Sequence, residues 1–291
     1  MTVAAASNIV GRSRGRTVVT TGLLVMVLVY AVLPITYLFI ASTKTESDLF
    51  TTFGFWFSDF RLFQNIAMVF AYHDGIFVRW LLNSFWYSAT AAIGATALSA
   101  TAGYALAMFR FPLREAMFRS ILCAIAVPQT ALVIPIFLLM TRAGIVDTPA
   151  AVILPSMIFP LGVYLMRIYV EDGVPRELLE AARVDGAGEV RIFILIACRL
   201  MAPGFVTVLL LSFVSAWNNY FLPQVVLTST ENLSLTIGLA NLYVLANNTA
   251  TGEPLFSIVI VGAFISVVPI VCAFLFLQRY WQAGVTAGAV K

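Results

Sequence analysis

Long apolar runs without charge are the feature of this sequence that most constrains its fold. Hydrophobic residues make up 61% of the chain and charged residues only 11%, and the mean hydropathy is +0.95. A soluble protein cannot cover so many apolar side chains with a polar surface. Runs of roughly 20 apolar residues have the length of a membrane-crossing α-helix. The sequence therefore predicts an all-α, polytopic membrane protein with a single transmembrane domain over residues 1–291.

Six segments are long and apolar enough to be predicted as membrane spans. They cover residues 18–41, 80–109, 120–141, 150–166, 201–227 and 255–277. The fourth is short and contains Pro155 and Pro160, so we expect a tilted and kinked helix there. A charged loop at residues 167–200 separates the fourth predicted span from the fifth.

The distribution of basic residues predicts the orientation, because Lys and Arg near span ends are retained on the cytoplasmic side. With the amino terminus inside, 13 of the 17 basic residues lie on the cytoplasmic side, and only Lys44, Arg61, Arg79 and Arg142 lie outside. We therefore expect both termini in the cytoplasm. The net charge of +3 follows from this orientation, and no basic stripe with interleaved aromatic residues indicates a nucleic-acid partner.

The sequence offers little for catalysis or metal binding. It has no Cys/His cluster, no CxxC motif and no paired carboxylates, and its only histidine is His73. It also lacks the glycine-rich phosphate loop with Lys and Ser/Thr that nucleotide hydrolysis of the Walker type requires. We expect no metal site and no ATP hydrolysis by this chain.

The charged loop has a helical pattern of its own. Pro175 suits a first helical position, Glu177 and Glu180 favour the positive start of a helix, and Gly186 can adopt the left-handed conformation that ends one. The predicted helix of about three turns is too short to cross a bilayer. Four residues fall near one face of it: Leu178, Ala181, Ala182 and Asp185. The small alanines allow close approach of another protein, and the alternative is a connector resting on lipid headgroups.

This loop resembles the signature of ABC importer permeases, which is Glu-Ala-Ala, three residues, Gly, nine residues and Ile. The matching residues are Glu180, Ala181, Ala182, Gly186 and Ile196. Other segments resemble the second permease subunit of the maltose-importer type, namely residues 83–84, 104–107, 110–112, 128–135, 216–219 and 284–291. The pattern departs at Cys198-Arg199, where the family has Leu-Pro, and Pro203 is the expected replacement.

The resemblance implies a non-catalytic permease subunit of an ATP-driven ABC sugar importer in the bacterial cytoplasmic (inner) membrane. Such a subunit forms half of the translocation path. The implied partners are a second, homologous permease subunit, a dimer of ABC ATPase subunits and an extracytoplasmic sugar-binding protein, besides membrane lipid. ATP and Mg are expected on the partner ATPase, with no cofactor bound by this chain.

The resemblance also assigns candidate residues. ATPase coupling is expected at Glu180, Ala181, Ala182, Asp185, Gly186 and Ala187. A tail that contacts the ATPase is expected at Gly284, Thr286, Gly288 and Lys291. An outer loop at residues 228–254, rich in Asn, Thr and Gly, is expected to approach the sugar-binding protein.

Polar residues within spans are costly unless they face protein or a water-filled cavity. They are therefore candidates for lining the sugar path, where Trp217 could stack on a sugar ring. The candidates are Ser212, Ser215, Trp217, Asn218, Asn219, Gln129 and Asn83. Hydrogen bonding between helices explains most of them equally well.

Two other functions remain open at this point. A permease for glycerol-phosphate or another small polar solute is one, although an anionic solute favours a cationic path, which the spans lack. An ion-coupled secondary transporter is the other, and it needs ionisable residues within the membrane, which the predicted spans also lack. The sequence does not name the sugar.

Overall fold

The computed structural model describes residues 7–248 and 253–288, and side chains from residue 16 to 248 and 253 to 278. Every regular element within these residues is helical, which confirms the predicted all-α fold. The chain divides into two compact units, one formed by residues up to 71 with 242–265 and the other by 72–241 with the residues from 266 onward. The single transmembrane domain stays a prediction.

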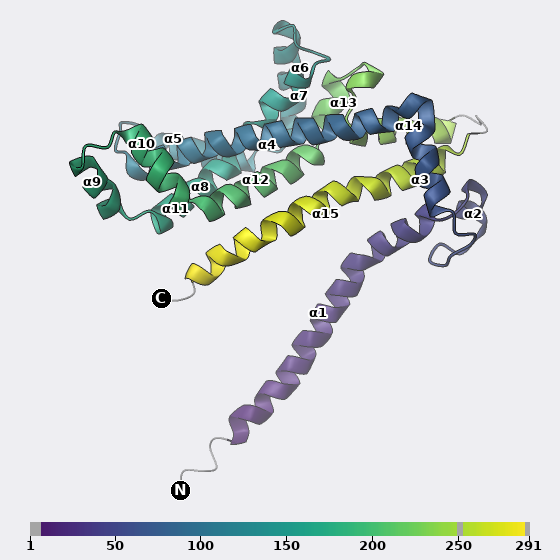
Figure 1. Ribbon diagram of the computed structural model, residues 1–291, viewed down its shortest axis with the longest axis horizontal. Coiled ribbons are helices and arrows are strands. Elements are labelled where there is room, and N and C mark those ends of the chain that lie inside the picture. The colour runs from purple at the N-terminus through teal and green to yellow at the C-terminus, as the bar shows by residue number, and fades with distance from the viewer. Residues whose placement is uncertain (1–6, 249–252, 289–291) are drawn as a thin grey trace. The chain divides into compact units, whose positions relative to one another are not determined.

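The first unit begins with the long apolar helix α1 (Ser7–Ser42), followed by α2 (Glu46–Thr51) and α3 (Leu62–Ala71) (Figure 1). It also holds the end of α14 (Leu235–Asn248) and the start of α15 (Leu255–Gly288). The Glu46 carboxylate accepts hydrogen bonds from the backbone N–H groups of Phe256, at 3.2 Å, and Ser257, at 2.8 Å. Because the first N–H groups of a helix have no partner within it, this carboxylate fixes the start of α15 against α2.

The second unit is built around α4 (Ile76–Met108), which packs against α8 (Pro160–Gly173) and α12 (Ala202–Trp217) (Figure 1). The helices approach closely at Gly103, where an added β-carbon would lie 2.7 Å from Met166 Cβ and 2.8 Å from the Arg167 backbone nitrogen. Only glycine allows this approach.

Shorter helices complete the second unit. They are α5 (Arg114–Ala126), α6 (Val133–Arg142), α7 (Pro149–Ser156), α9 (Arg176–Val184), α10 (Glu189–Ile192), α11 (Cys198–Leu200) and α13 (Phe221–Val226). Three 3₁₀ turns lie at Tyr72–Gly75, Gln129–Leu132 and Thr230–Asn232, and a π-helical turn lies at Phe193–Ala197.

Within the described part of the chain, four helical segments have the length and composition of a span, namely Arg16–Ser42, Leu62–Met108, Pro149–Gly173 and Leu255–Gln278. The expected number of six is reached if two bent helix pairs each count as one span. The third predicted span coincides with α5 and α6, which meet at 100°, and the fifth begins at a bend of 79°. Pro128 and Pro203 lie at these bends, where proline lacks the N–H that a continuous helix needs. The fourth span is interrupted before Pro160, as expected.

Candidate functional site

The end of the short helix α9 has the geometry that the sequence predicted. Gly186 has a φ of +83°, and its N–H donates to the Arg183 carbonyl at 3.0 Å, while the N–H of Ala187 donates to the Ala182 carbonyl at 3.0 Å. These two bonds satisfy carbonyls that the helix leaves open and form a Schellman stop. The start differs by one residue, because Pro175 is the residue before the first helical position.

Leu179 and Ala182 form the inward face of α9. Leu179 is 1% exposed and lies in one apolar cluster with residues of α4, α8, α10 and α12, against which Ala182 is also packed. Of the expected partner face of Leu178, Ala181, Ala182 and Asp185, Ala182 is half-buried and packs against this cluster. Leu178, Glu180, Ala181 and Asp185 remain exposed. A nine-residue helix must bury some apolar side chains to stay in place, and Leu179 with Ala182, three positions apart, does so.

The chain returns from α9 through α10, the π-helical turn and α11 to α12. Arg183 and Glu189 form a two-pronged ion pair between α9 and α10, with Nε–Oε1 at 2.6 Å and Nη2–Oε2 at 3.3 Å. Both side chains are more than a third exposed, so the pair orients the two helices and adds little stability. Cys198-Arg199 is helical, and the bend follows at Met201 with Pro203 in the first turn of α12. Pro203 thus takes the place expected for it.

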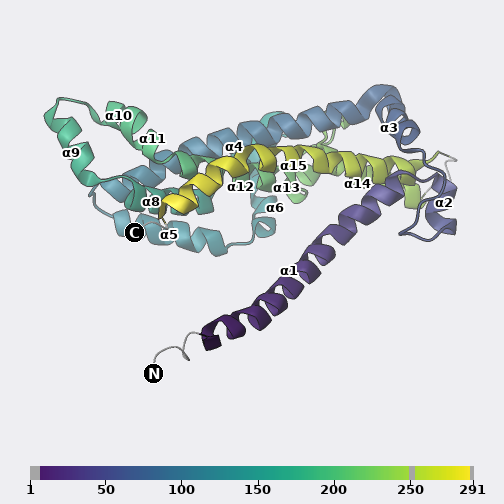
Figure 2. The same ribbon diagram turned by 60° about the horizontal axis from the view of Figure 1, so that its bottom comes forward.

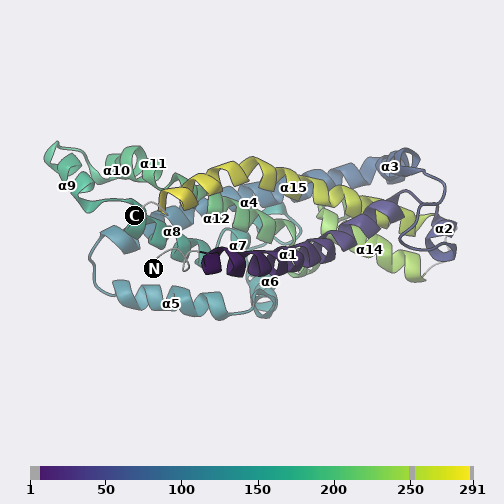
Figure 3. The same cartoon turned by 90° about the horizontal axis from the view of Figure 1, so that it is seen from below.

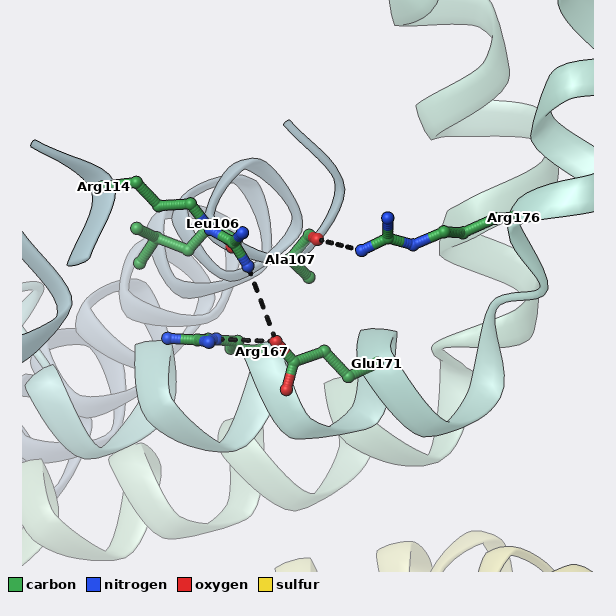
Figure 4. Close-up of polar contacts among 6 residues, drawn as sticks. All are labelled: Leu106, Ala107, Arg114, Arg167, Glu171 and Arg176. Carbon is green, nitrogen blue, oxygen red and sulfur yellow. Dashed lines mark hydrogen bonds and ion pairs between the residues drawn. The ribbon is translucent and has the colours of Figure 1, made fainter. Parts of the chain in front are cut away.

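A group of arginines binds the carbonyl end of α4 (Figure 4). Arg114 Nε donates to the Leu106 carbonyl at 2.5 Å, and Arg176 Nη2 donates to the Ala107 carbonyl at 3.3 Å. Glu171 pairs with Arg167 at 2.8 Å and with Arg114 at 3.8 Å. Cations at the end of a helix offset its negative pole and its open carbonyls.

Arg176 is the first residue of α9, so this group also attaches α9 to α4. In Figure 2 and Figure 3, α9 lies beyond the ends of α4 and α8. A cleft of about 330 Å³ lies at this junction, lined by Ala107, Met108, Glu171, Val174, Pro175, Arg176 and Glu177. Sequence reasoning missed Arg176 and Leu179. The i, i+3 spacing of Leu179 and Ala182 could have identified Leu179 as a buried residue.

A second polar centre lies between α6 and α7. The Asp147 carboxylate accepts hydrogen bonds from the N–H groups of Thr228, at 2.9 Å, and Ser229, at 3.0 Å, and from the Ser229 hydroxyl. Asn232 Nδ2 donates to the Asp147 carbonyl at 2.7 Å. These hydrogen bonds hold the pKa of Asp147 well below its usual range. We call Asp147 with residues 228–232 the Asp147 clasp.

The side chains of α4 bind the same loop from the other side. Trp80 Nε1 donates to the Thr230 carbonyl at 2.7 Å, and Asn83 Nδ2 donates to the carbonyls of Glu231, at 2.8 Å, and Leu233, at 3.0 Å. Tyr87 and Ser84 make further bonds to residues 232 and 235. Asn83, a predicted path residue, therefore holds the loop. The loop continues into α14, so the expected outer connector at residues 228–254 is in large part a helix.

The other predicted path residues differ in their surroundings. Ser212 is buried and donates to the Val208 carbonyl at 2.7 Å. Trp217 is 5% exposed and packs on Phe213, with ring centroids 5.8 Å apart. Asn219 Oδ1 accepts from the Leu222 N–H at 3.4 Å. Ser215 is half-buried, and Asn218 and Gln129 are exposed.

The predicted tail that contacts the ATPase lies partly outside the described residues. Gly284, Thr286 and Gly288 belong to the backbone of α15, but their side chains and the whole of Lys291 lie outside the described residues. Among the described residues, no group of three or more His, Cys, Asp or Glu side chains is placed to hold a metal ion.

Comparison of the chain with known families, sequences and structures finds transport-system proteins each time. Residues 95–283 match the family described as binding-protein-dependent transport system inner membrane component. The arabinooligosaccharides transport system permease protein of Halalkalibacterium halodurans is 36% identical over 90% of this chain and 91% of that protein. The lactose transport system permease protein of Rhizobium radiobacter is 32% identical over 90% and 91%. A chain of a bacterial ABC transporter involved in the import of the acidic polysaccharide alginate has a TM-score of 0.79 at 26% identity, over 93% of this chain and 98% of that one.

Proposed function

The chain belongs to the family of binding-protein-dependent transport system inner membrane components, and on this premise we propose how it works within an ATP-driven sugar importer. It is a non-catalytic permease subunit of an ABC importer in the inner membrane. The named relatives carry arabinooligosaccharides and lactose, which favours a sugar over glycerol-phosphate and argues against an ion-coupled transporter. In the proposal, this chain forms half of the path and receives the movement of a cytoplasmic ATPase through α9.

The attachment of α9 is the observation that carries this proposal. Leu179 fixes the helix in the apolar cluster shared with α4, α8 and α12, and Arg176 fixes its start to the last turn of α4. A short helix attached at two points moves as a rigid body with the helices to which it is bound. A push on α9 is therefore transmitted to the spans and is not absorbed in a flexible loop.

The outward face of α9 suits a protein partner. Leu178 and Ala181 offer apolar surface, while Glu180 and Asp185 are exposed carboxylates. A partner with basic groups around an apolar cleft is complementary to this face. We propose an ATPase dimer in this role, with ATP and Mg bound there, and a second homologous permease and an extracytoplasmic sugar-binding protein as the further partners. The tail from Gly284 to Lys291 is proposed as an additional ATPase contact.

We propose a narrower set of path residues than the sequence suggested. Asn218, Gln129 and half-buried Ser215 present polar groups at the surface of this chain. Ser212, Trp217, Asn219 and Asn83 have contacts within the chain that account for their positions. In the proposal, the first group contacts sugar and the second supports the helices that carry it.

Cross-linking tests the ATPase contact with two adjacent residues. In an importer assembled with its ATPase, Ala181→Cys is expected to form a cross-link to a cysteine placed in the ATPase cleft, in an ATP-dependent manner. Ala182→Cys is the matched control, because Ala182 packs inward and is expected to cross-link at least fivefold less. Equal cross-linking at both positions, or none at either, contradicts the proposed docking face.

Labelling from outside the cell tests the proposed orientation, with both termini and α9 in the cytoplasm. In a variant without Cys123, Cys198 and Cys272, a membrane-impermeant maleimide is expected to label Asn248→Cys and to leave Glu180→Cys unlabelled. Both positions are exposed in the structure, so accessibility within the chain does not separate them. After the cells are opened, both should be labelled. Labelling of position 180 in intact cells refutes the orientation.

A further inference from the structure

The segment between α1 and α3 folds around its own polar groups. Lys44 is 1% exposed, and its Nζ donates to Thr52 Oγ1 and to the Phe53 carbonyl, each at 2.8 Å. Asn65 is 7% exposed, and its Nδ2 donates to the carbonyls of Ser42, at 2.9 Å, and Lys44, at 2.8 Å. The interior of this segment is therefore polar.

The outside of the same segment is aromatic. We define residues 50–63 as the aromatic loop, and seven of its side chains are between 40% and 77% exposed: Phe50, Phe53, Phe55, Trp56, Phe57, Phe60 and Phe63. A water-soluble loop shows the reverse arrangement, with apolar side chains inside. Exposed apolar patches of this kind mark a surface that another apolar phase or molecule covers.

The aromatic loop continues the apolar surface of α1. Its rings contact the last turns of that helix, with centroid distances of 5.4 Å between Phe55 and Tyr37 and 6.3 Å between Phe57 and Phe39. Only 6% of the most apolar window of Arg16–Ser42 is buried within the chain. A helix with this surface crosses the hydrocarbon of the membrane, so the loop lies where a span ends.

Charged groups in the aromatic loop limit how deeply the loop can lie in the membrane. The side chains of Asp59 and Arg61 are 77% and 49% exposed and lie 3.7 Å apart. Charges are costly in the hydrocarbon centre. Trp residues at span ends lie at the level of the lipid headgroups, and Phe residues of interfacial segments insert at the boundary between headgroups and acyl chains. The combination of outward rings and outward charges fits the boundary between headgroups and acyl chains.

We propose that the aromatic loop is a lipid-interface anchor that inserts Trp56 and its neighbouring phenylalanines among the headgroups at the end of α1. The buried Lys44 and Asn65 hold the backbone so that the rings face the lipid. The ligand class is the interfacial region of a phospholipid bilayer.

Spin labelling of the full chain in phospholipid nanodiscs tests the depth. A nitroxide at Phe60→Cys, in the variant without native cysteines, is expected to show an oxygen-to-nickel-chelate collision ratio at least threefold above that of Glu180→Cys. Val25→Cys, well inside the predicted first span, should give a still higher ratio. A ratio at position 60 equal to that at 180 means that the loop is in water and overturns the proposal.

Lipid quenching gives a second measurement, and the Trp56→Phe substitution that it uses changes the fold little. The Trp56 emission is obtained as the difference between the unaltered chain and Trp56→Phe, and it is expected to fall at least twofold in nanodiscs with lipids brominated close to the headgroup. Lipids brominated near the chain ends should quench it less. If the emission is insensitive to both lipids, or if assembly with the other permease subunit removes the quenching, the loop is covered by solvent or protein and the proposal fails.

Discussion

Gly186→Val is expected to reduce ATP-driven sugar uptake by at least tenfold while the chain still inserts into the membrane. A β-branched residue is strained at a φ of +83°, at a cost of about 1–3 kcal/mol. Relief of this strain breaks the bonds from Gly186 and Ala187 that end α9. Because about 1.4 kcal/mol changes an equilibrium tenfold, the strain lowers the population of the α9 conformation that we propose for docking. Uptake of labelled sugar into vesicles measures the effect.

Gly186→Asn is the matched control for that experiment. Asparagine adds a side chain at the same place but tolerates the left-handed conformation, so uptake should stay within about threefold of the unaltered protein. Gly188→Ser is a second control, because Gly188 has a φ of −71° and precedes α10, where serine is favoured. A loss of uptake as large in Gly186→Asn as in Gly186→Val would mean that the added atoms, and not the backbone strain, block function.

Asp147→Ala is expected to lower the Tm of the purified protein by about 5 °C. Hydrogen bonds to a charged group contribute about 1.5–3 kcal/mol each, but the bond to Thr228 is exposed and contributes less because water can replace the carboxylate. A net loss of about 2 kcal/mol, at about 2–4 °C per kcal/mol, gives this shift. The substitution leaves the N–H groups of Thr228 and Ser229 without their acceptor. Thermal unfolding in detergent, followed by the retained monomer fraction, measures the change.

The Asp147 clasp also predicts that the contribution of Asp147 to stability does not change with pH over the neutral range. Hydrogen bonds hold the pKa of the folded carboxyl below its usual range, whereas the unfolded value is about 3.9. The contribution to stability is therefore complete above about pH 5 and is lost as the pH falls through the folded pKa. The difference in Tm between the unaltered protein and Asp147→Ala should be constant from pH 5 to 8. Asp59→Ala, at an exposed surface pair, should change Tm by less than about 1 °C.

The features that sequence reasoning predicted correctly are those that depend on local chemistry. Apolar length identifies α1, α4 and α15, and a glycine six residues after Glu180 identifies the stop at Gly186. Pro203 was predicted from the resemblance, as the replacement for the proline of the family's Leu-Pro, and its missing N–H suits the bend at which it lies. These properties are fixed by a few neighbouring residues, so no knowledge of the tertiary structure is needed.

The features that sequence reasoning missed depend on contacts between distant segments. Ala182 could face a partner or its own core, and the choice depends on the apolar cluster around Leu179. Asp147 and Ser229 are 82 positions apart, and no periodicity connects them. From the sequence, Asn83 was interpreted as a polar group within a span. In the structure its amide donates to backbone carbonyls about 150 positions away. The predicted path therefore included residues that support the fold.

The attachments at both ends of α4 make this helix a stiff rod between two polar centres. Its 33 residues span about 50 Å at about 1.5 Å per residue, which exceeds the roughly 30 Å hydrocarbon thickness. A tilt of about 5° over that length displaces one end by about 4 Å relative to the other, far beyond the range of a hydrogen bond. The loop bound by Trp80 and Asn83 must therefore move with α4 when the helix tilts. A movement of one end of α4 on one side of the membrane thus displaces this loop on the other side.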